Sequence, residues 1–164
     1  MRRHKNVINV AEAESAERLT GSRFGGAVKK LGVLAGGEKI GCNYFEIPPG
    51  RALCPHHWHA SNEEAIFVIE GEGTMRIGSE EVPVRSGDYV AFPTGPETAH
   101  QLVNSGEAPL RYLCLSTKNP VEVVGYPDSK KIGALAGAAG SADKWVGKFF
   151  PDDADVDYFV GEDS

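Results

Sequence analysis

Short runs of alternating apolar and polar residues fill the middle of the chain. In "EEAIFVIE", Ile66 and Val68 fall on one side of an extended strand, and Phe67 and Ile69 fall on the other. Similar runs recur at short intervals and are separated by turns of glycine, proline and asparagine, a spacing typical of a sandwich or barrel. We therefore predict an all-β protein whose strands include the segments CNYFEI, EEAIFVIE, TMRIG, EEVPV, YVAFP, AHQLVN, LRYLCLST and VEVVGY.

The segments on either side have weaker patterns. "NVAEAESAERL" predicts a short helix capped by Asn9, and residues 21–41 predict irregular structure with one or two edge strands. After Tyr126 the alternation stops, and "IGALAGAAGSA" predicts a flexible loop. We expect an N-terminal extension over residues 1–41, a barrel over 42–126, and a loop-rich tail over 127–164 that packs on the barrel. The aromatic end "DYFV" either docks there too or is a solvated acidic tail.

Length and charge narrow the class of protein. The 164 residues suit one domain, and a net charge of −6 leaves no broad basic surface for nucleic acid or acidic lipid. No apolar stretch approaches the ~20 residues that span a bilayer, and the first residues lack the apolar core of a secretory signal. Three cysteines without C-x-x-C spacing fit a reducing compartment, so we expect a cytoplasmic protein.

The stretch "CPHHWHASNEEAIFVIEGEG" carries the candidate chemistry. On an extended strand His57 and His59 share one face, whereas His56 points the opposite way, out of a barrel. Glu64 follows at the start of the next strand, and His100 is the one histidine further along the chain. Three imidazoles and a carboxylate suit a divalent transition metal, with two octahedral positions left open. The alternative from these residues alone is that the histidines are ordinary buried side chains held by hydrogen bonds.

Two motifs in the chain resemble those of the cupins. The first cupin motif is glycine, five residues, H-x-H, three or four residues, glutamate, six residues and glycine. The second is glycine, five residues, P-x-G, two residues, histidine, three residues and asparagine. Here they read Gly50, "RALCPH", His57, Trp58, His59, "ASNE", Glu64, "AIFVIE", Gly71, and then Gly87, "DYVAF", Pro93, Thr94, Gly95, "PETA", His100, "QLV", Asn104. The departures are one extra residue before His57 and two before His100.

The resemblance implies a double-stranded β-helix, or jelly-roll barrel, with a metal in its mouth. It assigns His57, His59, Glu64 and His100 as the ligands. Glu63 is the rival carboxylate, but the six-residue gap to Gly71 favours Glu64. The segments "GYPDSKKIG" and "DVDYFVGE" resemble a branch of small bacterial single-domain cupins that carries a loose sugar-phosphate isomerase label.

Such a site implies a small metalloenzyme of the isomerase, lyase or dioxygenase type. One iron, manganese, nickel or zinc ion would bind a small organic molecule through neighbouring oxygens. Glu63 or a tyrosine is the candidate base. A sugar phosphate would need a basic clamp, and Arg51, Arg76 and Arg111 are too scattered in the sequence to indicate one. The alternative is a non-enzymatic barrel that binds or senses a small molecule.

We also expect a homodimer. Small barrels leave edge strands that tend to pair with a second copy. The segment around Val33 and the C-terminal "DYFV" have the apolar character to cover such edges.

Overall fold

The computed structural model describes residues 3–137 and 144–162, and within them nearly all regular structure is strand. The helical elements are α1 (Leu31–Leu34) and the 3₁₀ turns η1 (Pro96–Thr98) and η2 (Pro127–Ser129). The strands are β1 (Ala16–Thr20), β2 (Phe24–Lys29), β3 (Ile40–Ile47), β4 (Trp58–His59), β5 (Glu64–Glu70), β6 (Glu72–Ile77), β7 (Glu80–Arg85), β8 (Tyr89–Phe92), β9 (His100–Val103), β10 (Leu110–Thr117), β11 (Val121–Tyr126), β12 (Lys131–Gly137) and β13 (Lys144–Pro151).

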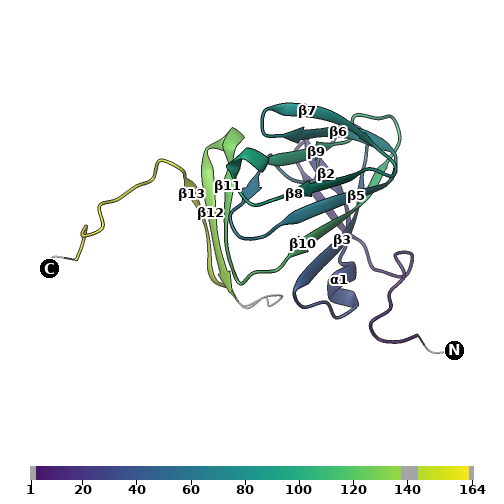
Figure 1. Ribbon diagram of the computed structural model, residues 1–164, viewed down its shortest axis with the longest axis horizontal. Helices are drawn as coiled ribbons and strands as arrows, with labels where there is room; N and C mark the ends of the chain where they lie inside the picture. Colours follow the sequence, from purple (N-terminus) through teal and green to yellow (C-terminus); the bar gives the residue numbers. More distant parts are fainter. Residues whose placement is uncertain (1–2, 138–143, 163–164) are drawn as a thin grey trace.

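Three sheets build the molecule (Figure 1). A six-stranded sheet in the order β1-β2-β3-β10-β5-β8 lies across from a three-stranded sheet, β7-β6-β9. One core cluster joins residues of both sheets, including Val68 and Leu110 from the larger sheet and Met75 and Leu102 from the smaller. A third sheet, β13-β12-β11-β4, flanks them. This is the all-β jelly-roll barrel that the sequence predicts.

Strand β5 buries one face and exposes the other, as its alternating sequence predicts. Ile66 and Val68 are 5% and 0% exposed, whereas Phe67 and Ile69 on the opposite face are 39% and 40% exposed. All eight segments predicted as strands contain strands. Apolar residues at every second position therefore sufficed to place the walls of the barrel.

The predicted helix over Asn9–Leu19 is wrong. The Asn9 side chain accepts a hydrogen bond from the backbone N–H of Ala11, and its carbonyl accepts from Glu12 and Ala13, so Asn9 caps only one turn. The chain then becomes extended in β1, which pairs with β2. The segment has too few apolar residues to bury a helix face, and the free edge of β2 offers backbone partners instead.

The stretch between residues 21 and 41 is more regular than expected. It contains β2, which lies inside the six-stranded sheet between β1 and β3, and the short helix α1. Gly26 in β2 has no room for a side chain, because an added Cβ would lie 2.5 Å from the carbonyl oxygen of Glu46. The glycines that made this segment look irregular thus permit close packing of strands.

The C-terminal region also departs from expectation. Of the predicted loop over residues 132–142, residues 132–137 belong to β12, and the rest lie outside the described residues. β12 pairs with both β11 and β13, so partners distant in sequence override a weak local pattern. Beyond Pro151 the chain leaves the barrel as an exposed arm, residues 152–162, with Tyr158 87% and Phe159 66% exposed (Figure 1). In the described residues, no helix has the length and hydropathy to cross a membrane.

Candidate metal centre

Backbone pairing brings the two histidine-bearing segments together. The His57 N–H donates to the His100 carbonyl at 3.1 Å, and the His100 N–H donates to the His57 carbonyl at 2.7 Å. The next two residues form β4, which pairs Trp58 with Gly125 and His59 with Val124 of β11. A short loop then leads to β5, which begins at Glu64. The ladder therefore fixes the relative positions of these segments.

Four side chains converge at this point. His57, His59, Glu64 and His100 each offer a ligand atom, and these atoms all lie within 4.8 Å of one another. One Glu64 carboxylate oxygen lies 3.9, 3.6 and 3.3 Å from the Nε2 atoms of His57, His59 and His100, respectively. These are the four residues that the resemblance assigns, and a single ion between them would reach every donor.

Each imidazole turns its Nε2 atom to the centre because its Nδ1 atom faces an acceptor. Nδ1 of His57 lies 2.8 Å from the Pro55 carbonyl, and Nδ1 of His100 lies 3.0 Å from the Thr98 carbonyl. Nδ1 of His59 lies 3.4 Å from the Glu122 carboxylate. Metal-binding histidines almost always present their second nitrogen to a carbonyl or carboxylate in this way, so the donor set fits a metal ion.

Burial and charge give the ring pKa values opposite shifts in the metal-free site. Burial, followed by the nearby His100 and His59 rings, lowers the pKa of His57 to about 4. Burial acts in the same direction on His59, but the carboxylates of Glu64 and Glu122 outweigh it and raise the pKa of that ring. Burial would raise the pKa of Glu64, yet hydrogen bonding to His100 and His59 lowers it strongly. The Glu64 carboxylate is therefore ionised in the centre, and the nearby His59 and His100 rings disfavour protonation of His57.

Two aromatic rings form walls of the centre. Phe92 is the β8 partner of Glu64, and its ring stacks on His100 with centroids 3.8 Å apart. On the other side, the ring of Tyr126 at the end of β11 stacks 6.1 Å from His57. Burial raises the pKa of the Tyr126 hydroxyl, which keeps its proton at neutral pH. The centre thus has one apolar wall and one wall that carries a hydroxyl donor.

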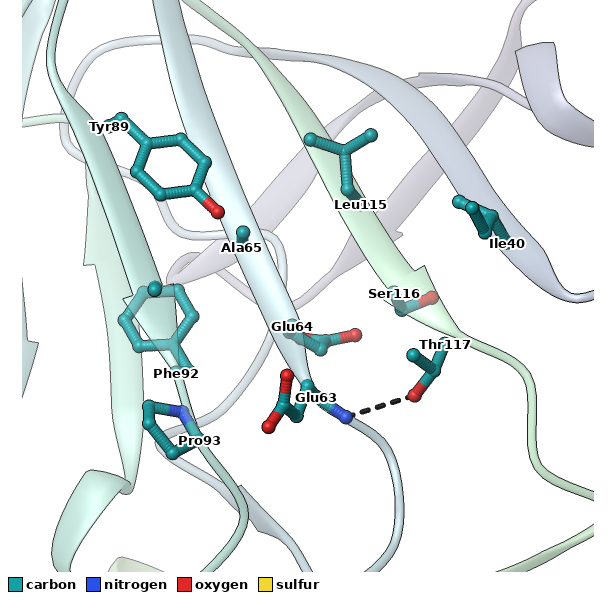
Figure 2. Close-up of a pocket in the computed structure, with 11 residues that line it drawn as sticks. Ile40, Glu63, Glu64, Ala65, Tyr89, Phe92, Pro93, Leu115, Ser116 and Thr117 are labelled. Atoms are coloured by element: carbon teal, nitrogen blue, oxygen red, sulfur yellow. Dashed lines mark hydrogen bonds between the residues drawn. The ribbon is translucent and has the colours of Figure 1, made fainter.

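Glu63, the candidate base, lies apart from the four converging residues. Its side chain is exposed, whereas Glu64 is half-buried, and it lines a groove with Tyr89, Pro93 and Thr117 (Figure 2). Its backbone N–H donates to the Thr117 hydroxyl at 3.0 Å. The two adjacent glutamates thus line the same groove, but only Glu64 is one of the four converging donors.

The expectation that His56 points outward is wrong. Its strand parity is opposite to that of His57, but the side chain is 3% exposed, because the turn η2 covers that face of the barrel. Asp128 of η2 lies 3.7 Å from His56 Nδ1 and is held by Arg76 at 2.8 Å. His56 is therefore buried behind the centre rather than solvated.

Two other residues near the centre are structural. Burial raises the pKa of the Cys54 thiol to about 11, which makes it a poor nucleophile or metal ligand. Asn104 is fully buried, donates to the carbonyls of Ile47 and Ala108, and accepts from the Gly106 N–H, so it holds the turn after β9. The three cysteines form no disulfide.

The sequence did not single out Glu122 or Tyr126. One signal was available for Glu122, because it shares strand parity with the buried Val124 and is thus an acid on an inward face. An acid at such a position needs specific partners, and here they belong to the loop beside His59. Tyr126 carried no comparable signal, since its place beside His57 depends on the pairing of β4 with β11.

Comparison with known proteins finds relatives of the barrel. Residues 43–116 match the family model described as the cupin domain. Over 60 residues the chain is 38% identical to an uncharacterized protein of Methanocaldococcus jannaschii, covering 37% of this chain and 46% of that protein. Over 71 residues it is 30% identical to an oxalate-binding protein of Thermotoga maritima, covering 43% of this chain and 56% of the relative. The chain thus spans about half the length of these curated relatives.

A solved structure matches over more of the fold. It is named a sugar phosphate isomerase from a cupin superfamily, comes from Silicibacter pomeroyi, and superposes with a TM-score of 0.77 at 24% identity. The match covers 90% of this chain and 94% of that one, so the shared fold includes the strands on either side of the barrel. With the family match and the barrel in agreement, residues 43–116 form a cupin domain.

Proposed function

We propose that the chain binds one divalent transition metal through His57, His59, Glu64 and His100, and that it acts as a small metalloenzyme. The observation that carries this proposal is the convergence of four ligand atoms within 4.8 Å, with every Nδ1 atom turned to an acceptor. Nitrogen and carboxylate donors suit iron, manganese, nickel or zinc. When bound, the ion would supply a Lewis acid at the mouth of the barrel.

The substrate that this site favours is a small acid or enediol with two neighbouring oxygens. Four protein donors leave room for a bidentate ligand in an octahedral shell. The Lys131 ammonium group lies 4.9 Å from the centroid of the Tyr126 ring, which itself stacks on His57, and would favour an anion on that side. The relative named as an oxalate-binding protein is consistent with a ligand of this chemistry. An anionic chelator therefore matches both the donor set and its surroundings.

A sugar phosphate is a weaker candidate. The three arginines that could have formed a phosphate clamp are each engaged within the chain. Arg111 pairs with Glu46 and Glu70 at 2.7 and 2.6 Å, and Arg76 pairs with Asp128 at 2.8 Å. Arg51 donates to two backbone carbonyls. The structural match to a sugar phosphate isomerase therefore supports the barrel more than the substrate.

Tyr126 and Glu63 are the side chains proposed for proton transfer. Tyr126 lies next to His57 and keeps its proton, so it can donate a hydrogen bond or a proton to a substrate oxygen. Glu63 is exposed in the loop just before β5 and would act as base only on a substrate that extends from the mouth of the barrel. Phe92 excludes water from the face of His100.

The second candidate is a barrel that binds a chelating ligand without turning it over. The curated relative described as a binding protein favours this alternative. Metal and ligand binding are common to both candidates. Product formation separates them.

The test begins with elemental analysis of the purified protein, followed by thermal shift with oxalate, lactate and catechol. Chelating ligands should raise the melting temperature of the metal-loaded protein and leave that of the metal-free protein unchanged. Equal stabilisation of both forms would show that the ligands bind elsewhere and would overturn the proposal. Oxygen uptake and product analysis then distinguish enzyme from binding protein.

We also propose that two copies of the chain associate. β1 is an edge strand of the large sheet, and all five of its residues are exposed. The arm over residues 152–162 carries exposed apolar side chains that its own barrel leaves uncovered: Val156, Tyr158, Phe159 and Val160. Val33 in α1 is also exposed. A second copy would cover this apolar surface and the free strand edge.

A further inference from the structure

Glu122 differs from the other acids of the chain in its burial and its partners. Its side chain is 7% exposed, and both of its oxygens are engaged. One oxygen accepts from the backbone N–H groups of Ala60, Ser61 and Val123 at 3.1, 3.0 and 2.9 Å. The other accepts from the backbone N–H of Asn62 at 2.9 Å and from the Asn62 side chain. Because every one of these partners donates, the side chain acts only as an acceptor.

The same carboxylate reaches a candidate ligand. Nδ1 of His59 is buried without a hydrogen bond in the described residues, and it lies 3.4 Å from the Glu122 oxygen that accepts from Asn62. The His57 and His100 rings instead use the carbonyl two residues earlier, at Pro55 and Thr98. The carbonyl two residues before His59 is that of His57, and this carbonyl already accepts a hydrogen bond from the His100 N–H. His59 therefore needs an acceptor from another strand.

Glu122 also contacts the loop that leads from His59 to Glu64, another of the candidate ligands. Residues 60–63 join His59 at the end of β4 to Glu64 at the start of β5, and Glu122 accepts hydrogen bonds from the backbone N–H groups of the first three. Asn62 and Asn119 also secure this loop, since the side-chain oxygen of Asn62 accepts a hydrogen bond from the backbone N–H of Asn119 at 2.7 Å. A single buried acid thus constrains the spacing of two donors.

We propose that Glu122 is the positioning residue of the metal centre: it orients the His59 ring and holds the loop that sets His59 against Glu64. This inference rests on the proposed metal-binding function. Charge supports it, because three neutral imidazoles and two carboxylates, those of Glu64 and Glu122, carry a net charge of −2 that a divalent ion balances. Acids that hold metal-bound histidines in this way typically change metal affinity about 10- to 100-fold when replaced.

The test measures Co²⁺ affinity and the visible spectrum of the Co²⁺-loaded protein. Glu122→Gln should weaken Co²⁺ binding about 10- to 100-fold and shift the spectrum, because its single oxygen stays with the N–H groups of Ala60, Ser61 and Val123 and its NH2 group then faces His59. Glu46→Gln is the matched control, since it makes the same acid-to-amide change at a carboxylate that pairs with Arg111 and has no contact with the four candidate ligands. It should lower the melting temperature while keeping the affinity within about threefold of wild type and the spectrum unchanged.

A double-mutant cycle separates positioning from a purely structural role. In a His59→Ala background, Glu122→Gln should change the Co²⁺ affinity far less than it does in the wild type. An equal loss in both backgrounds, or a folded Glu122→Gln protein with wild-type affinity and spectrum, would overturn the inference. Should the glutamine variant not fold, Glu122→Asp carries the same test, and unchanged affinity there would also overturn it. Wild-type protein that fails to bind Co²⁺, Mn²⁺ or Zn²⁺ would instead refute the proposed function.

Discussion

The rings of Phe92 and His100 stack face to face, with centroids 3.8 Å apart and planes inclined by 10°. Phe92 is 2% exposed, so its ring both fills the core and limits rotation of the histidine. Few side chains in this molecule combine a packing role and a role at the centre so directly.

Replacing Phe92 should therefore affect both stability and metal binding. Phe92→Leu is expected to lower the free energy of unfolding by about 1–2 kcal/mol and to weaken metal binding several-fold, because His100 gains rotational freedom. Urea unfolding and calorimetric titration measure the two effects. Phe67→Leu, on the exposed face of β5, is the control and should change neither strongly. Unchanged metal affinity in Phe92→Leu would show that the stacking does not orient His100.

The two adjacent glutamates should behave differently. Glu64→Gln should weaken metal binding, and alanine at His57, His59 or His100 should lower the metal content sharply, since each change removes one of the converging donors. Glu63→Gln should leave the metal content near that of wild type. Elemental analysis of the purified variants checks this. A Glu63→Gln protein without metal, beside a loaded Glu64→Gln protein, would reverse the assignment.

Acid should destabilise the metal-free protein through His57. The pKa of this ring is about 4 in the fold and 6.5 when unperturbed, so folding favours its neutral form. Its contribution to stability is complete above pH 6.5 and is lost as the pH falls toward 4, a change of up to about 3 kcal/mol. The raised pKa of His59 has the opposite effect on stability: its contribution is complete below pH 6.5 and is lost as the pH rises above that value.

Urea unfolding of the metal-free protein at several pH values measures this effect. His57→Gln is the matched variant, because it removes the titrating ring. The stability difference between wild type and variant should shrink between pH 6.5 and 4. A difference that stays constant over that range would show that burial does not disfavour the charged ring.

Gly125 should tolerate no side chain. A Cβ added there would lie 2.1 Å from the Trp58 ring, and Trp58 stands between His57 and His59. Gly125→Ala is expected to lower the free energy of unfolding by about 1–3 kcal/mol and to weaken metal binding by displacing β4. In a Trp58→Ala background the same change should cost much less. Equal damage in both backgrounds would contradict the steric explanation.

The proposed association of two copies predicts a dimer at micromolar concentration. Light scattering coupled to gel filtration should give about twice the mass of one chain, 17.6 kDa. A chain that ends at Pro151 lacks the exposed aromatic arm and should dissociate more readily. A monomeric full-length protein would refute the proposal.

The sequence predicted the parts of this molecule that depend on local pattern. Alternation placed β5 and the other barrel strands, and motif spacing brought together His57, His59, Glu64 and His100. It failed where distant partners decide the outcome. β12 is a strand because β11 and β13 pair with it, and His56 is buried because η2 covers it. Neither contact leaves a signal within the segment itself.

The reciprocal backbone hydrogen bonds between His57 and His100 have a thermodynamic consequence. They form an isolated β-bridge within the barrel and would persist whichever ion occupies the centre. Assembly of the donors is then a product of folding, unlike in zinc fingers, which remain unfolded until the metal arrives. Chelation should strip the ion from an intact barrel. The identity of the ion would accordingly be decided after folding, by competition among the metals that the folded protein encounters.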